Sequence, residues 1–249
     1  MNDQPDLSFY FAIHQAQRDA VGRYRAAVGT LTQRERCDRG KALARWTKGF
    51  VLELDEHHYV EDTFFFPSLR SRVASAGSTL DGLGSDHRRL DDLLARWPAV
   101  AGALVDRRVP FVDAQADAAA LAEELHDFLD RHLEVEDRDV LPLFWRHYSP
   151  EDYDQVFQQA VKNGKKAGLW FVAPFSVDCY AEGPDREAFL ASVPGVLRLF
   201  HRLVRPRYDR LVATALGPAV EPSCAGAGTG VGLGVGVGAP SASAPRNLR

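Results

Sequence analysis

The sequence predicts an all-α protein built on an up-down-up-down four-helix bundle, with additional C-terminal helices and a disordered Gly/Ala-rich tail. Two observations predict the bundle. The pattern H-x-x-x-E-D-x-x-x-x-P begins at His57 and recurs 75 residues later at His132. A further histidine precedes each copy, His14 by 43 residues and His87 by 45. Each half of this region therefore reads as a helical hairpin, and two such hairpins pack as a four-helix bundle.

Each expected helix has apolar residues at three- and four-residue spacing. This spacing predicts helices over residues 8–28, 40–66, 85–98 and 113–145. Ser8 is the expected N-cap of the first helix. Pro67 should kink or end the second helix, because proline cannot donate a backbone hydrogen bond. The glycines from Gly77 to Gly84 predict a break before the third helix, which ends at Pro98 or a little later.

The composition divides the chain into three parts: residues 1–147 as the bundle, residues 148–217 as a helical extension that packs on it, and residues 218–249 as a tail. In the extension, Ser149 and Pro150 begin a short helix, an apolar segment follows at 169–175, and a helix pair is broken at Pro194. The arginines of the last helix read as a solvated face rather than a membrane or anion contact. Glycine at nearly every second position from 226 to 238 predicts a disordered tail.

The overall composition narrows the class of protein. With 249 residues, 45% of them apolar, the chain can bury a substantial core. A formal net charge of −4 argues against binding to nucleic acid. Three scattered cysteines suit a reduced compartment, and the polar N-terminus lacks the features of a secretory signal. We therefore expect a cytoplasmic protein without a transmembrane segment, and the sequence identifies no protein partner.

The repeated motif predicts a metal site, because residues four apart on a helix project from one face. Two buried glutamates beside histidines need a cation to be tolerated. The expected ligands are His14, His57, Glu61, His87, His132 and Glu136. Six imidazole and carboxylate ligands on four helices suit two octahedral ions, and iron is favoured over zinc or manganese.

Other polar residues lie near this set. His58 is about 100° around the helix from His57, so we expect it off the site, and the same argument excludes His126. Asp91, one turn after His87, is an open seventh candidate. Tyr10 shares a face with His14 as a possible hydrogen-bond donor, and Glu53 is placed to orient an imidazole.

These residues resemble the hemerythrin-like, or HHE cation-binding, family over about residues 8–147. The resemblance implies a non-haem di-iron site, with His14 and His57 on one iron, His87 and His132 on the other, and Glu61 and Glu136 bridging. It also implies a small ligand such as dioxygen, nitric oxide or peroxide. Oxygen-carrying members place two histidines four residues apart on the third helix, whereas this chain has Leu83 and Asp91 at the flanking positions.

Three functions stay open at this point. The first is a binding protein that senses, stores or scavenges a small oxidant. The second is a di-iron enzyme that decomposes peroxide or oxidises Fe(II), which more open coordination positions would favour. The third is a structural metal-binding helical bundle.

Overall fold

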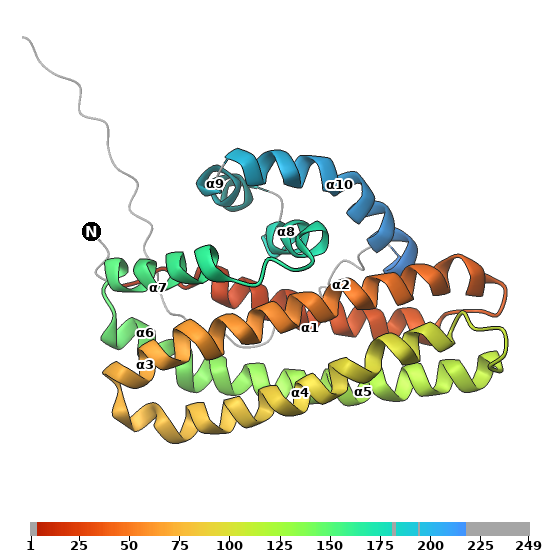
Figure 1. Cartoon of the computed structure of the whole chain (residues 1–249), viewed down its shortest axis with the longest axis horizontal. Coiled ribbons are helices and arrows are strands. Elements are labelled where there is room, and N and C mark those ends of the chain that lie inside the picture. Colours follow the sequence, from red (N-terminus) through yellow and green to blue (C-terminus); the bar gives the residue numbers. More distant parts are fainter. Residues whose placement is uncertain (1–3, 181–182, 194, 218–249) are drawn as a thin grey trace, which may run out of the picture. The chain divides into compact units, whose positions relative to one another are not determined.

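The computed structural model describes residues 4–180, 183–193 and 195–217 (Figure 1). Within these ranges the chain is helical and contains no strand, which confirms the predicted fold class. The predicted disordered tail, residues 218–249, lies outside the described residues, as does Pro194.

Four long helices form the bundle, and successive helices run in opposite directions (Figure 1). They are α1 (Ser8–Gly29), α2 (Arg39–Val60), α4 (Gly77–Ala103) and α5 (Phe111–Val135). Helix α5 packs against α1 and α4, and α4 packs against α2. Short 3₁₀ turns, η1 (Glu35–Cys37) and η3 (Ala74–Ala76), lie in the connections.

Each copy of the repeated motif contains a π-helical turn. Helix α2 passes through η2 (Glu61–Phe65) into α3 (Phe66–Arg72), and α5 passes through η4 (Glu136–Val140) into α6 (Leu141–His147). The proline of each motif is the second residue of α3 or α6. In a regular α-helix its ring would clash with the carbonyl four residues earlier. The wider turn accommodates the proline, so the chain stays helical beyond it.

The predicted break from Gly77 to Gly84 is wrong, because α4 begins at Gly77. Leu80 and Leu83 continue the apolar spacing of this helix and are fully buried. Their burial outweighs the poor helix propensity of the glycines, since most helix stability in proteins comes from packing.

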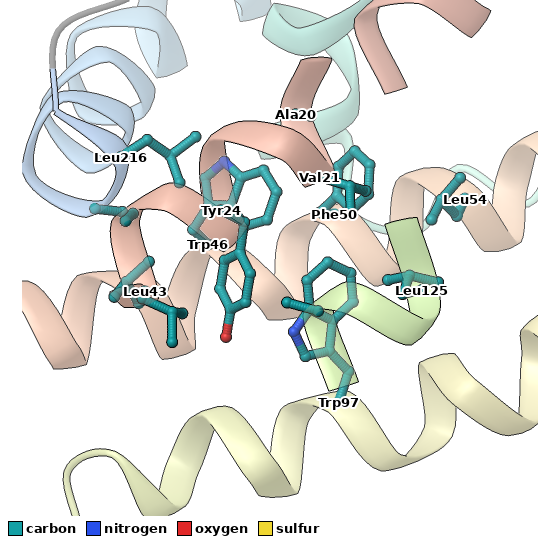
Figure 2. Packing of buried hydrophobic residues seen from close by; sticks show 14 of the residues in the cluster. Ala20, Val21, Tyr24, Leu43, Trp46, Phe50, Leu54, Trp97, Leu125 and Leu216 are labelled. Atoms are coloured by element: carbon teal, nitrogen blue, oxygen red, sulfur yellow. The ribbon is translucent and has the colours of Figure 1, made fainter. Parts of the chain in front are cut away.

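The core consists of two apolar clusters. The large cluster includes Leu54, Leu90 and Leu129 and fills most of the bundle. Figure 2 shows part of it, including Tyr24, Trp46 and Trp97; the ring centroids of Tyr24 and Trp97 are 4.9 Å apart. The small cluster, which includes Leu83, Phe65 and Leu141, lies around the π-helical turns. The two clusters are separated by the layer of polar residues described below.

The rest of the described chain forms four helices. They are α7 (Pro150–Asn163), α8 (Leu169–Asp178), α9 (Pro184–Ser192) and α10 (Gly195–Leu216). Ser149 caps α7 in a reciprocal pair with Asp152, as the sequence predicts. Helices α8 and α10 pack along α2, and α10 also contacts α1. None of the described helices combines the length and the apolar composition that crossing a membrane requires.

A close contact fixes α8 on the bundle. Gly49 of α2 faces the Phe171 ring so closely that an added Cβ would lie 2.3 Å from a ring carbon. We expect Gly49→Ala to lower the free energy of unfolding by about 1–3 kcal/mol, because the ring must move. Urea unfolding measures this change.

Gly82→Ala is the matched control, because Gly82 is also helical but has open space around its Cβ position. There alanine should stabilise the helix by about 0.5–1 kcal/mol. Equal effects of the two substitutions would contradict the packing of Phe171 against Gly49.

Candidate metal centre

The structure brings the six predicted ligands together in one layer of the bundle. His14 comes from α1, His57 from the last turn of α2, His87 from α4 and His132 from α5. Glu61 and Glu136 are the first residues of the two π-helical turns. Turns of this kind often occur at functional sites. His57 is partly buried, and the other five residues are at most 2% exposed.

The two glutamates lie between two groups of imidazoles. His14 and His57 form the His14 group, and His87 and His132 form the His87 group. Glu61 Oε1 is 3.3 Å from His57 Nε2, and Glu61 Oε2 is 3.5 Å from His87 Nε2. Glu136 Oε2 is 3.3 Å from His14 Nε2, and Glu136 Oε1 is 3.3 Å from His132 Nε2. Each carboxylate thus presents one oxygen to each imidazole group, which is the arrangement that a carboxylate bridging two cations requires.

Many polar atoms in this layer are buried without a hydrogen-bond partner. They include the Nε2 atoms of His14, His57, His87 and His132, Oε2 of Glu61 and both carboxylate oxygens of Glu136. Leaving one buried polar atom unsatisfied costs about 1–3 kcal/mol. Metal ions placed among converging imidazole nitrogens and carboxylate oxygens would satisfy these atoms together, so the residues fit a metal centre.

A second set of carboxylates orients the imidazoles from outside. His14 Nδ1 lies 2.6 Å from Asp137 Oδ1, and His87 Nδ1 lies 3.0 Å from Asp62 Oδ1. A carboxylate only accepts, so each Nδ1–H donates and Nε2 is left to face the centre. The sequence reasoning missed both aspartates. The signal was the Asp that follows Glu in each copy of H-x-x-x-E-D.

The same contacts set the protonation of the metal-free layer. Burial favours a neutral imidazole, but the hydrogen bond to Asp137 and the nearby glutamates raise the pKa of His14 to about 9. Burial lowers the pKa of His57 to about 4. A metal binds the neutral imidazole, so binding must displace the proton held by His14.

The position of His58 corrects the sequence prediction, which placed it off the site. His58 is 3% exposed, and neither of its ring nitrogens has a hydrogen-bond partner. One ligand atom from each of His58, His87 and His132 lies within 4.8 Å of the others. His57 lies beside His14 of α1, with ring centroids 5.2 Å apart, and His58 stacks on His87 of α4 with ring centroids 4.4 Å apart. These two consecutive residues of α2 therefore face different neighbouring helices.

Other candidates lie outside the layer. Asp91, the open seventh candidate, is exposed and belongs to neither group of potential ligands. His126 is also outside, as predicted, and its Nδ1 is 3.4 Å from Asp127. Leu83, the flanking position four residues before His87, is part of the small apolar cluster.

Tyr10 has the predicted role as a donor. Its side chain is buried, and its hydroxyl donates a hydrogen bond to Glu61 Oε1. Burial, reinforced by the charges of Glu61 and Glu136, raises the pKa of Tyr10 well above its usual value. The phenol therefore keeps its proton over the whole physiological pH range.

Glu53 differs from its expected role. It was expected to orient an imidazole, but its Oε1 accepts a hydrogen bond of 3.1 Å from Gln17 Nε2, and its Oε2 is buried without a partner. Burial raises the pKa of Glu53 to about 8, although the Gln17 bond and His14 oppose this shift. The folded chain thus favours the protonated carboxyl.

This shift predicts a pH dependence of stability. Because the folded pKa of Glu53 lies above the unfolded value, its favourable contribution is present below the unfolded pKa and is lost as pH rises to about 8. Glu53→Gln stays neutral, so we expect it to raise the melting temperature of the metal-free protein at pH 9 by at least about 4 °C. At pH 5 the two proteins should differ little. Thermal unfolding followed by circular dichroism measures both, with the exposed Glu134→Gln as control. Equal melting temperatures at pH 9 would contradict a buried, unpaired carboxyl.

A helical bundle with imidazoles and carboxylates converging in its core defines a class of metal-binding helical proteins. The model of the hemerythrin HHE cation binding domain matches residues 7–144. The chain therefore belongs to the hemerythrin HHE cation-binding domain family, which confirms the resemblance drawn from the sequence. No curated protein and no solved structure matches the chain.

Proposed function

We propose that this chain is a non-haem di-iron protein that binds dioxygen, nitric oxide or peroxide in order to sense, store or scavenge it. The observation that carries the proposal is the placement of Glu61 and Glu136, each with one oxygen toward each imidazole group. His14 and His57 would hold one iron, and His87 and His132 the other. His58 would offer a third imidazole to the second iron.

The two iron positions differ in their number of protein ligands. If both glutamates bridge, the chain would offer four ligands to an iron beside His14 and His57 and five to an iron beside His58, His87 and His132. An octahedral ion takes six ligands. The first position would therefore be the more open one. Tyr10 adjoins it, since its ring centroid is 5.0 Å from that of His14 and 6.1 Å from that of His57.

The chain's own residues define the surroundings of the small ligand. Iron would supply reversible electron transfer to a bound oxidant. The two apolar clusters above and below the layer exclude water, and Phe66 stacks on His87 with ring centroids 5.6 Å apart. Tyr10 holds a proton at its hydroxyl beside Glu61 Oε1. With His58 counted, the layer contains five imidazoles, which favours binding of the oxidant over the enzymatic alternative.

Metal analysis tests the proposal. Protein purified without oxygen should contain about two irons per chain by elemental analysis, as the two ligand groups predict. Exposure to air should produce new visible absorption, and removal of oxygen should reverse it if binding is reversible. Zinc alone, or less than about half a metal per chain after reconstitution with Fe(II), would contradict the di-iron proposal. Steady turnover of peroxide would favour the enzyme.

A further inference from the structure

A second candidate site lies away from the metal layer, where the beginning of α2 meets the C-terminal half of α10. A pocket of about 440 Å³ opens there, which is large enough for a small organic ligand. It is lined by Lys41, Ala42, Arg45, Arg207, Arg210, Leu211 and Thr214. Four of these side chains are cationic, and none is acidic.

The four cations have no acidic partner among the described residues. Lys41, Arg45, Arg207 and Arg210 form no ion pair there, whereas arginines close to them in sequence do. Arg205 pairs with Asp178 and Asp209 at 2.6 Å. Asp178 and Asp209 are thus already paired, and no carboxylate lines the pocket. Four like charges around one hollow repel one another, and a bound anion would remove this cost.

Two of the cations are held in place. The guanidinium of Arg45 lies over the Trp170 ring, 5.3 Å from its centroid. Arg210 Nε donates to the carbonyl of Pro206 at 3.2 Å, which leaves its terminal nitrogens free. Lys41 lies in the first turn of α2, three residues after the N-cap residue Asp38, with which it forms no ion pair.

We propose that this pocket binds the phosphoryl groups of a multiply charged ligand. Arginine and lysine are suited to phosphate oxygens, and the buried apolar side chain of Leu211 gives the pocket a non-polar wall. Arg207 and Arg210 are exposed, as the sequence predicts for the arginines of this helix, and they line the pocket opposite α2.

The phosphate has two possible sources. It can belong to a free molecule such as a nucleotide, or to a lipid headgroup. The second source has support in α10, where Val196, Leu199 and Leu203 are 58–74% exposed and precede Arg207 on the same helix face. The chemistry recognised in the pocket is the same in both cases, so the experiment has one arm for each source.

The first arm uses calorimetric titration of the full iron-loaded chain with ADP in low salt, with adenosine as the uncharged control. We expect one ADP per chain, no binding of adenosine, and weaker binding as salt screens the charges.

R207E/R210E should bind at least about tenfold more weakly, because attraction becomes repulsion. Lys41→Gln, on the other helix, should also weaken binding. R198E/R202E is the control. It changes the net charge by the same amount at two exposed arginines of α10 that do not line the pocket, and it should bind as the wild type does.

The second arm uses vesicles of phosphatidylcholine with and without phosphatidylglycerol. Sedimentation with the anionic vesicles only, lost in R207E/R210E and retained in R198E/R202E, supports the pocket with a lipid source. Melting temperatures and iron content are measured for every variant and after titration, so that unfolding or iron chelation is recognised. If the folded protein binds neither ADP nor anionic vesicles, or if both double variants lose binding equally, the proposal is wrong.

Discussion

If the chain holds two irons as proposed, Glu136→Gln is expected to remove most of the stability that iron gives to the protein. Glu136 contacts imidazoles of both groups, so its loss affects both metal positions. Iron held at about 1,000 times its Kd stabilises a protein by about 4 kcal/mol, which raises the melting temperature by roughly 8–16 °C at this size. In Glu136→Gln this rise should fall to less than about half, because the amide lacks the charge that a cation attracts.

Differential scanning calorimetry before and after chelation measures the effect. Glu134→Gln is the matched control, since Glu134 lies two residues away and is exposed. It should keep the full rise on iron loading. A Glu136→Gln protein that retains about two irons and the wild-type rise in melting temperature would show that this carboxylate is not a ligand.

His58→Leu is expected to weaken iron binding at one of the two proposed positions, so that fewer than about two irons per chain remain after buffer exchange. The side chains are similar in volume, so the helices should pack as before. The position beside His87 and His132 loses one of its three imidazoles, whereas the position beside His14 and His57 keeps all its ligands. Elemental analysis after equal reconstitution measures the change. His126→Leu removes a histidine outside the layer and should leave the content unchanged. If the His58→Leu protein still holds two irons, His58 is not a ligand, and the six ligands predicted from the sequence are sufficient.

The repeated motif made the bundle and the main polar layer predictable from sequence. The spacing of His57 and Glu61, repeated at His132, places both pairs on core-facing helix surfaces, and the earlier histidines complete the symmetry. His58 was missed because its angle of about 100° from His57 around the helix axis was taken to turn it away from the site. Its neighbour is instead His87 of α4, on another side of α2 from His14. The start of α4 was missed because glycine propensity was weighed without the burial of Leu80 and Leu83.

The contacts between distant segments could not be predicted in this way. Asp62 pairs with His87 and Asp137 pairs with His14, across 25 and 123 residues of sequence. The basic pocket also depends on α10 lying along α2, which no local pattern specifies. Periodicity tells which face of a helix is buried, but it does not tell which helix covers that face.

The π-helical turns make these two places sensitive to the length of the chain. Deleting one residue between Glu61 and Phe65 would close η2 into a regular α-helix, because a π-helical turn holds one residue more than an α-helical turn. The ring of Pro67 would then clash with the carbonyl four residues before it. Replacement of the exposed Thr63 changes no contact of the metal layer, whereas its removal takes away the wider turn that accommodates the proline. Deletions, rather than substitutions at exposed positions, are therefore the changes that these turns cannot tolerate.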